Sequence, residues 1–418
     1  MVGTMAKIDD SVKKKVPELR FPGFTDDWEE RKLGSLTTVV RGASPRPIQD
    51  PKWFDKESDI GWLRIADVTE QNGRIYHLEQ HISKLGQEKT RVLTEPHLLL
   101  SIAATVGKPV VNYVKTGVHD GFLIFLNPTF EREFMFQWLE MFRPKWQKYG
   151  QPGSQVNLNS ELVRNQEIVL PNYKEQQKIG SFFKQLDNTI TLHQRKLDLL
   201  KEQKKGYLQK MFPKNGAKVP ELRFAGFADD WEERKLGDIS YKVKEKNKTG
   251  EFTETLTNSA EYGIINQRDF FDKDISNAKN LTGYYVVKND DFVYNPRISN
   301  FAPVGPIKRN KLGRTGVMSP LYYVFRTHDI DKNYFEKYFD TVYWHRFMEL
   351  NGDSGARADR FAIKDSVFVE MPIPYPTMDE QQKIGSFFKQ LDDTIALHQC
   401  KLDLLKEQKK GFLQKMFV

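Results

Sequence analysis

The feature that most constrains this chain is an internal duplication. The 20-residue stretch Val16–Ser35 returns at Val219–Asp238 with three differences, and the 38-residue stretch Glu175–Phe212 returns at Glu380–Phe417 with four. The copies lie 203 and 205 residues apart, so two near-identical frames enclose inserts of similar length whose sequences differ. A solenoid would need several copies at a period of about 20–50 residues. The duplication therefore predicts a pseudo-twofold molecule that presents two different surfaces in one geometry.

Each copy of the longer stretch carries apolar residues at alternating spacings of four and three, which predicts a heptad seam on one long helix. The seam residues are Ile179, Phe183, Leu186, Ile190, Leu197 and Leu200 in the first copy, and Ile384, Phe388, Leu391, Ile395, Leu402 and Leu405 in the second. Asn172 and Glu175 have the spacing of a capping box at the start of the first helix. Because a lone heptad stripe must be buried, we expect the two helices to pair within the chain as an antiparallel coiled coil that acts as a spacer. A helix of this length would span about 57 Å at ~1.5 Å per residue.

Two histidines, His193 and His398, interrupt the seam at equivalent positions. A histidine there could be a metal ligand or a pH-dependent switch. A polar residue in a heptad seam more often fixes the register of the paired helices, and we favour that interpretation.

The two inserts share an order of landmarks. Each has an apolar run, a polar loop with glycine, a second apolar run, a helical stretch (Glu131–Lys148 or Asn333–Leu350) and a last strand that ends in proline. Short apolar runs punctuated by glycine and proline predict two globular modules of mixed α/β (α+β) fold. The predicted segments are an N-terminal arm (1–15), module 1 (16–171), a central helix (172–212), module 2 (213–376) and a C-terminal helix (377–418).

The chain carries a formal net charge of +8, which favours a polyanionic partner. Arginine can bond guanine O6 and N7 together, asparagine and glutamine can do the same to adenine, and glycine lets the backbone approach phosphate. Polar, glycine-containing loops in both modules therefore supply candidate DNA contacts. These are Arg41, Ser44, Arg46, Arg64, Lys108, Ser154, Gln155 and Asn157 in module 1, and Asn258, Gln267, Arg268, Arg297, Asn300, Lys308, Arg314, Ser354, Arg357 and Arg360 in module 2.

Signatures of catalysis are missing from the sequence. We find no phosphate-binding G-x-x-x-x-G-K-[ST] loop and no glycine-rich nucleotide signature. Cys400 is the single cysteine, and His77 and His81 lie four apart without a third metal ligand. No apolar run approaches the ~18 residues of a membrane span. We expect a cytoplasmic protein that has no catalytic, cofactor-binding or metal-binding residues of its own.

The duplicated motifs resemble a known family. The stretch PELRFPGF…W with KLG, and EQQKIGSFFKQLD with LLKEQKKGYLQKMF, are similar to the conserved regions of type I restriction-modification specificity subunits of the Gram-positive type. The order of module, central repeat, module and C-terminal repeat matches as well. The resemblance covers essentially the whole chain beyond residue 15.

The resemblance implies that each module is a target recognition domain that reads one half of a split, asymmetric site on double-stranded DNA. It also implies that the helix pair sets the spacing between the halves and docks two methyltransferase subunits. Those subunits would use S-adenosylmethionine, and restriction subunits that join the complex would use ATP and magnesium. Outward helix positions such as Lys184, Arg195, Lys201 and Lys205 would face either these partners or solvent.

Two alternatives stay open at this stage. The chain could be a nuclease or methyltransferase with a diverged active site, which would act on DNA without added subunits. It could also be a scaffold whose helices pair between chains, which would form a dimer without sequence preference for DNA.

Overall fold

The computed structural model describes residues 16–146, 158–214, 216–270, 278–353 and 359–418. The chain divides into two compact units: unit 1 is made of Met1–Gln194 and Cys400–Val418, and unit 2 of Arg195–Gln399. The predicted segments separate modules from helices, whereas this division assigns part of each long helix to each module. The reason is that the helix ends pack into the hydrophobic cores of the modules.

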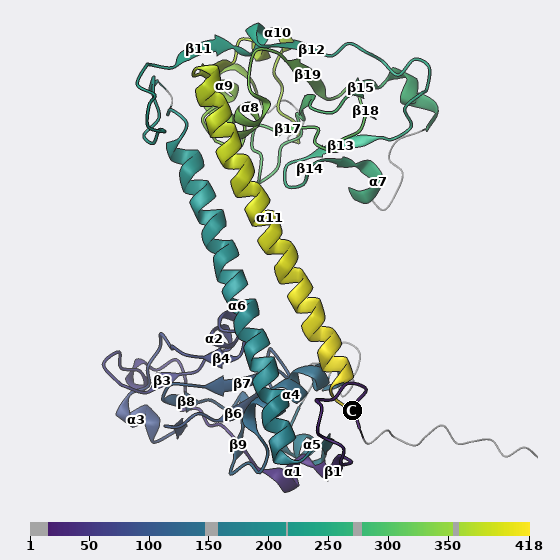
Figure 1. The fold of residues 1–418 in the computed structure, drawn as a ribbon. Helices are drawn as coiled ribbons and strands as arrows, with labels where there is room; N and C mark the ends of the chain where they lie inside the picture. Colours follow the sequence, from purple (N-terminus) through teal and green to yellow (C-terminus); the bar gives the residue numbers. More distant parts are fainter. Residues whose placement is uncertain (1–15, 147–157, 215, 271–277, 354–358) are drawn as a thin grey trace, which may run out of the picture. The chain divides into compact units, whose positions relative to one another are not determined.

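Two uninterrupted helices account for the longer repeat. They are α6 (Tyr173–Lys210) and α11 (Met378–Lys415), teal and yellow in Figure 1. All twelve predicted seam residues are buried or half-buried. His193 and His398 are half-buried in the same seam.

The two helices run antiparallel within each unit. In unit 1 the Phe182 ring lies edge-to-face against Phe412, with centroids 5.2 Å apart. In unit 2 the Tyr207 ring lies against Phe387 at 5.0 Å. Tyr207 and Phe412 occupy equivalent repeat positions, as do Phe182 and Phe387. Each unit therefore contains the same helix contact with the roles of the two helices exchanged.

The capping box predicted at Asn172 is only half formed. Asn172 Oδ1 accepts a hydrogen bond from Glu175 N–H (3.0 Å), but both oxygens of the buried Glu175 carboxylate accept from Arg20 at 2.7 Å. Glu380 and Arg223 repeat this pairing in unit 2 at 2.6 and 2.8 Å. A bidentate, charge-assisted pair is stronger than the reciprocal hydrogen bond of a capping box.

The shorter repeat closes the opposite ends of the helices. Leu19 N–H donates to the carbonyl of Lys415 in unit 1, and Leu222 N–H donates to that of Lys210 in unit 2, both at 2.8 Å. The last carbonyls of a helix have no partner within it, so these bonds satisfy groups that would otherwise be open.

Each module is built on a mostly antiparallel sheet. The strand order is β2-β9-β6-β7-β4 in unit 1 and β12-β19-β16-β17 in unit 2. The strands of the unit 1 sheet are β2 (Thr38–Arg41), β4 (Arg74–Ile75), β6 (Leu98–Ser101), β7 (Pro109–Asn112) and β9 (Phe122–Leu126). Those of the unit 2 sheet are β12 (Ser240–Lys242), β16 (Phe292–Tyr294), β17 (Ile307–Arg309) and β19 (Tyr323–Thr327).

Smaller strand groups complete both modules. Unit 1 adds β1 (Glu29–Lys32) paired with β10 (Glu167–Leu170), and a sheet of β3 (Gly61–Trp62), β8 (Thr116–Val118) and β5 (Arg91–Leu93). Unit 2 adds the pairs β11 (Glu232–Lys235) with β20 (Pro372–Tyr375), β13 (Leu256–Ser259) with β14 (Gly263–Asn266), and β15 (Tyr285–Val287) with β18 (Gly316–Met318).

Four strands of the main sheet correspond between the units although their sequences differ. Leu98 of β6 lies opposite Phe125 of β9, and Phe292 of β16 lies opposite Phe325 of β19 in the same way. Strand β4 is the difference: it adds to β7 in parallel at the edge of the unit 1 sheet, and the described unit 2 sheet ends at β17. The mixed α/β prediction is confirmed.

The helical stretch after the main sheet differs from the prediction in unit 2. In unit 1 it is the single helix α4 (Arg132–Trp146). In unit 2 it is broken into α8 (Lys332–Tyr338) and α9 (His345–Asn351). The Thr341 hydroxyl donates to the carbonyl of Tyr338 (2.7 Å) and the Trp344 indole donates to that of Phe339 (3.3 Å), so side chains take up carbonyls that a continuous helix would use.

Short helices complete both modules. They are α1 (Leu33–Leu36), α2 (Ile65–Glu70), α3 (Lys84–Gln87), α5 (Ser160–Asn165), α7 (Gln267–Phe270) and α10 (Asp365–Phe368), with 3-10 turns η1 (Pro51–Trp53), η3 (Leu236–Asp238) and η4 (Ala278–Gly283).

Glycine in the frame lets each module helix approach closely. A Cβ on Gly180 of α6 would lie 2.8 Å from the backbone nitrogen of Phe134, in the first turn of α4. A Cβ on Gly385 of α11 would lie at the same distance from the nitrogen of Tyr334, in the first turn of α8. Both frames therefore dock their modules through the start of this helix.

Candidate nucleic-acid interface

The predicted loop after β2 in unit 1 is organised by one carboxylate. Ser44 Oγ and Arg46 Nη2 each donate to a carboxylate oxygen of Asp120 at 2.7 Å, and Arg41 Nε donates to the Asp120 carbonyl at 2.6 Å. Burial raises the pKa of Asp120, but the hydrogen bond from Ser44 and the charge of Arg46 outweigh burial, so this pKa lies below its usual value. Three predicted residues from one loop are thus held together on an ionised aspartate.

Glycine makes this arrangement sterically feasible. A Cβ on Gly42 would lie 2.1 Å from the carbonyl oxygen of His119, which leaves no space for any side chain. Gly42 N–H donates to the Phe122 carbonyl at 2.9 Å, so the loop lies directly on the β8–β9 turn.

Arg64 joins the same region of unit 1. It lines a cavity of about 300 Å³ together with Ser44, Arg46 and Asp120. Its guanidinium pairs with Asp67 at 2.8 Å and with Glu79 at 3.1 Å, whereas the Arg46 side chain is 76% exposed. Arg46 is therefore the better placed of the two to meet a phosphate or a base.

Lys108 and Lys308 do not fit the predicted role in DNA contact. Lys108 Nζ is bound to the Glu140 carboxylate of α4 and its side chain is 13% exposed. Lys308 Nζ lies 3.0 Å from Asp340, just after α8, and its side chain is 26% exposed. Both ammonium groups are paired with a carboxylate beside the module helix and, unlike the paired but 76% exposed Arg46, belong to side chains with little exposure, so neither is well placed to meet a phosphate. A sequence shows a lysine in a basic region but not its distant partner.

Five predicted residues lie outside the described part of the chain. They are Ser154, Gln155, Asn157, Ser354 and Arg357. Asn159, two residues after Asn157, caps α5, with Oδ1 accepting from Glu161 N–H and Leu162 N–H.

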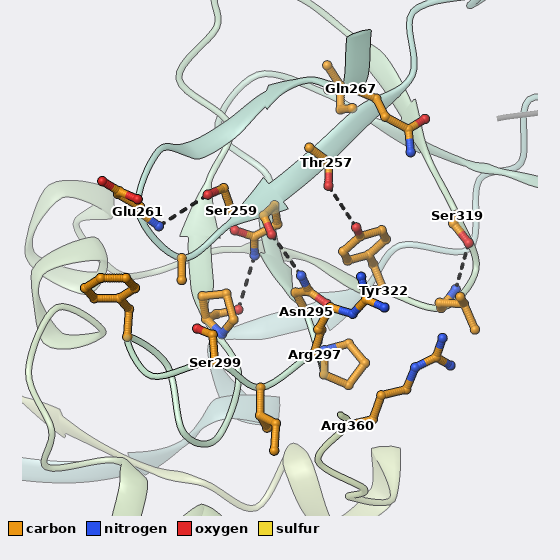
Figure 2. Close-up of a pocket in the computed structure, with 18 of the residues that line it drawn as sticks. Thr257, Ser259, Glu261, Gln267, Asn295, Arg297, Ser299, Ser319, Tyr322 and Arg360 are labelled. Atoms are coloured by element: carbon orange, nitrogen blue, oxygen red, sulfur yellow. Dashed lines mark hydrogen bonds between the residues drawn. The ribbon is translucent and has the colours of Figure 1, made fainter. Parts of the chain in front are cut away.

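In unit 2 a cavity of about 600 Å³ gathers four of the predicted residues: Asn258, Gln267, Arg297 and Arg360 (Figure 2). They come from β13, α7 and two loops that an isolated bridge between Arg297 and Arg360 joins. The Thr257 hydroxyl and the Tyr322 hydroxyl are hydrogen bonded at 3.0 Å on one wall. Loops far apart in sequence thus form one polar concavity.

Asn258 cannot make the predicted two-point contact with adenine in this arrangement. Its side-chain nitrogen donates to the carbonyls of Val293 (2.7 Å) and Pro306 (3.1 Å), and the residue is 2% exposed. Two carbonyl acceptors fix the orientation of the amide, because only the nitrogen can donate. Asn258 therefore holds β13 against the main sheet.

The remaining predicted residues of unit 2 differ in how far their charge is neutralised. Arg314 donates to both carboxylate oxygens of Glu254 at 2.7 Å, and this pair lowers the pKa of Glu254. The Arg297 side chain is 63% exposed and contacts Asp359 only at 3.5 Å. Arg268 and Asn300 are exposed. Among the described residues that line the cavity, Arg297 is thus an exposed cation with only a long contact to a carboxylate.

Sequence reasoning missed the acids and the apolar side chains of these loops. Asp120 and Glu254 fix the arginines, and Phe301 (79% exposed) and Leu321 (59%) line the unit 2 cavity. An aromatic residue beside Asn300 in a polar loop was the available signal for Phe301. An exposed phenylalanine can contact the methyl group of thymine in the major groove of duplex DNA.

The described residues form neither a metal site nor a membrane-spanning helix. They contain no group of three or more His, Cys, Asp or Glu placed to hold a metal ion. None of the helices that the structure describes is both long and apolar enough to cross a membrane.

Comparison with known proteins identifies the protein family that this chain resembles. The model of the type I restriction modification DNA specificity domain matches twice, over residues 25–202 and 228–407. The chain is 23% identical to the putative type I restriction enzyme MjaX specificity subunit of Methanocaldococcus jannaschii, over 93% of this chain and 92% of that protein. It is 20% identical to the MjaVIII specificity subunit of the same organism, over 96% and 93%.

A solved structure shares the fold. The S subunit of the type I restriction-modification system from M. genitalium superposes with a TM-score of 0.61 at 12% sequence identity, over 96% of this chain and 99% of that one. The two family matches lie on the two modules and on most of α6 and α11. The chain therefore belongs to the family of type I restriction-modification specificity subunits and carries two copies of its DNA specificity domain.

Proposed function

We propose that this chain is the non-catalytic subunit that gives a type I restriction-modification complex its DNA sequence specificity. Each module reads one half of a split, asymmetric site on double-stranded DNA, and the pair of helices sets the separation of the halves. One observation carries the proposal: near-identical frames hold two modules whose main sheets share four strands in the same order and whose exposed loops differ in chemistry. Arg46 and its neighbours on Asp120 would contact DNA in unit 1, and Arg297, Arg360 and Phe301 in unit 2.

The two repeated helices also carry a surface on which partner subunits could dock. Leucines at equivalent positions of both helices are exposed: Leu192 (67%), Leu199 (51%), Leu397 (68%) and Leu404 (57%). Large exposed apolar side chains at repeated positions favour protein contacts. Two methyltransferase subunits would dock here in equivalent ways and use S-adenosylmethionine. Restriction subunits would join through the complex and use ATP and magnesium, and the cytoplasm would be the compartment.

Lysines on the helices contribute less than expected to such a surface. Lys184 lies 3.6 Å from Glu133 of α4, so it faces the module of its own unit. Lys201 and Lys205 are exposed, as is Arg195, whose repeat position holds Cys400.

Exchanging one module tests the proposal. Replacing Trp28–Pro171 by a second copy of Trp231–Pro376 should remove the half-site that module 1 reads and keep the one that module 2 reads. Methylome sequencing of a host that carries this chain and its methyltransferase subunits measures both halves. Changes in both halves would contradict modular recognition.

A control separates this function from catalysis by the chain itself. The purified chain is incubated with S-adenosylmethionine and DNA without other subunits, and no methyl transfer is expected. Methyl transfer under these conditions would show that the chain is an enzyme.

Removing the exposed charge of Arg46 should weaken binding through electrostatics. We expect Arg46→Ala to lower the DNA affinity of the assembled complex by roughly tenfold, and to reduce the slope of log K against log salt by about one, because one phosphate contact releases about one counterion. Titrations at several salt concentrations measure both quantities. The control is Lys389→Ala, which removes one charge from a 65% exposed position on α11. An equal loss in both variants would show that only net charge matters.

A further inference from the structure

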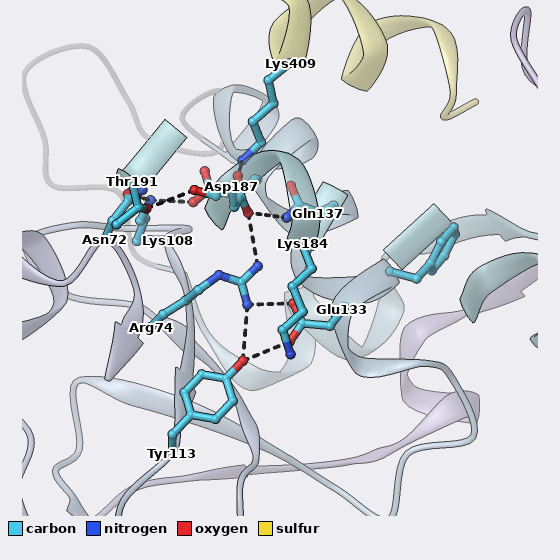
Figure 3. A network of polar contacts seen from close by, with 12 residues as sticks. Asn72, Arg74, Lys108, Tyr113, Glu133, Gln137, Lys184, Asp187, Thr191 and Lys409 are labelled. Carbon is cyan, nitrogen blue, oxygen red and sulfur yellow. Dashed lines mark hydrogen bonds and ion pairs between the residues drawn. The ribbon is translucent and has the colours of Figure 1, made fainter. Parts of the chain in front are cut away.

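Each unit holds a row of four linked charges where the frame meets the module, with side chains at most 19% exposed in unit 1 and at most 28% exposed in unit 2. In unit 1, Lys409 Nζ lies 2.6 Å from Asp187 Oδ1, and the other oxygen of Asp187 lies 3.1 Å from Arg74 Nη2. Arg74 Nη1 in turn lies 2.6 Å from Glu133 Oε2 (Figure 3). These four side chains are between 7% and 19% exposed.

Unit 2 repeats the order of charges. Lys204 Nζ lies 2.7 Å from Asp392 Oδ1, and Lys337 Nζ lies 2.8 Å from Asp392 Oδ2. Lys337 also lies 2.9 Å from Asp340. In both units the row of charges has the same order: a lysine and an aspartate of the frame, then a cation and a carboxylate of the module.

The charged residues that the two helices contribute occupy equivalent repeat positions, but the charged residues that the two modules contribute do not. Asp187 and Asp392 occupy one repeat position, and Lys204 and Lys409 another. The module cation of unit 2 is on helix α8, six residues after its N-cap Asp331. That of unit 1 is on strand β4, the edge strand for which the described unit 2 sheet has no counterpart.

The helix position of unit 1 shows how the two solutions differ. Gln137, six residues after Glu131, occupies in α4 the place that Lys337 has in α8. Its side-chain nitrogen donates to Asp187 Oδ2 at 2.7 Å, but it carries no charge. Arg74 supplies the charge that Gln137 lacks. Two dissimilar modules thus meet one electrostatic requirement from different elements.

The requirement follows from the burial of the frame aspartate. A buried carboxylate is stable only if cations and hydrogen-bond donors surround it, and removing one partner leaves an uncompensated charge. Burial raises the pKa of Asp187, but Lys409 and Arg74 outweigh it, so this pKa lies below its usual value. The aspartate stays ionised and needs the module's cation.

We propose that the Asp–Lys pair of each frame is a charge socket that positions the recognition module. A module fits when it presents to the aspartate a cation that a carboxylate of the same module also holds. The inference goes beyond the proposed function, because it concerns how a module is seated and not what it reads.

Moving the cation tests the socket directly. In the full chain, Arg74→Gln should lower Tm by roughly 5–10 °C, because it removes the guanidinium that lies 2.6 Å from the buried Glu133 carboxylate and leaves Lys409 as the one cation of the row beside Asp187. Adding Gln137→Lys should restore at least half of that loss, since it installs the unit 2 solution in unit 1. Thermal unfolding is followed without DNA or other subunits, so the result does not depend on DNA recognition.

A matched control excludes a general effect of charge. Gln185→Lys adds the same charge at an exposed position of α6 and should restore nothing in the Arg74→Gln background. Rescue by both lysines, or by neither, would overturn the proposal, because Arg74 would then act through net charge or packing.

Unit 2 offers a second test if Arg74→Gln does not fold. Asp392→Asn should lower Tm by several degrees, because Lys337 and Lys204 lose their shared carboxylate. The neighbouring Asp393→Asn should change it by less than about 1 °C, since Asp393 is 71% exposed and the equivalent position of α6 is already Asn188. Equal effects would overturn the socket.

Discussion

Replacing Phe183 by alanine is expected to lower the free energy of unfolding by about 3–5 kcal/mol. The ring is fully buried in the seam of α6 and contacts Phe182 at 5.2 Å and Phe417 of unit 1 at 5.9 Å between centroids. Truncation leaves a cavity among residues that the helix backbone holds in place. Denaturant unfolding of the full chain measures the loss, and Phe388→Ala makes the equivalent test in unit 2.

The control lies on the same helix. Leu192→Ala removes a side chain that is 67% exposed, so stability should change by less than about 0.5 kcal/mol. If the proposed docking surface is correct, Leu192→Ala weakens association with the methyltransferase subunit, whereas its effect on unfolding stays small. A Phe183→Ala variant no less stable than Leu192→Ala would contradict the packing of the seam.

Lengthening both helices by one heptad should lower methylation of the original site at least tenfold. Seven residues inserted after Gln194 in α6 and after Gln399 in α11 keep the heptad phase and add about 10 Å. That length corresponds to about three base pairs, which also turns the groove by about a third of a helical turn. Methylome sequencing should find the original spacing lost, and a longer spacer in any site that is still methylated.

The matched control inserts seven glycine and serine residues after Gly250, an exposed turn residue of module 2 with φ +71°. It adds the same number of residues without changing either helix and should leave the spacing as it was. Unchanged spacing in the helix variant would show that the length of the helices does not set the separation of the half-sites.

The sequence was most informative where one periodic pattern determines the structure. The heptad spacing alone selected twelve side chains that are buried or half-buried in the structure, because the residues that share one face of a helix depend only on their spacing within that helix. The duplication likewise predicted two equivalent frames, and the apolar runs predicted the buried strands. The break between α8 and α9 was missed because it depends on two hydrogen bonds made by Thr341 and Trp344.

The roles of the loop residues were harder to predict from the sequence, because their side chains are bound by residues distant in sequence. Lys108 is paired with Glu140, and the Asn258 amide donates to the carbonyls of Val293 and Pro306. These two candidate DNA contacts therefore bind groups of their own module. Arg74 was not singled out at all. Nothing in its local sequence shows that β4 reaches Asp187, which lies 113 residues away.

The hydrogen bond from Leu19 to Lys415 has a consequence for the connectivity of the chain. In unit 2 the same bond joins Leu222 to Lys210, which are neighbours along the polypeptide. In unit 1 the two residues are 396 positions apart, yet the geometry is the same. A short covalent connection between the two residues is therefore not required for this hydrogen bond, because the unit 1 copy forms it at the same length between residues far apart in sequence.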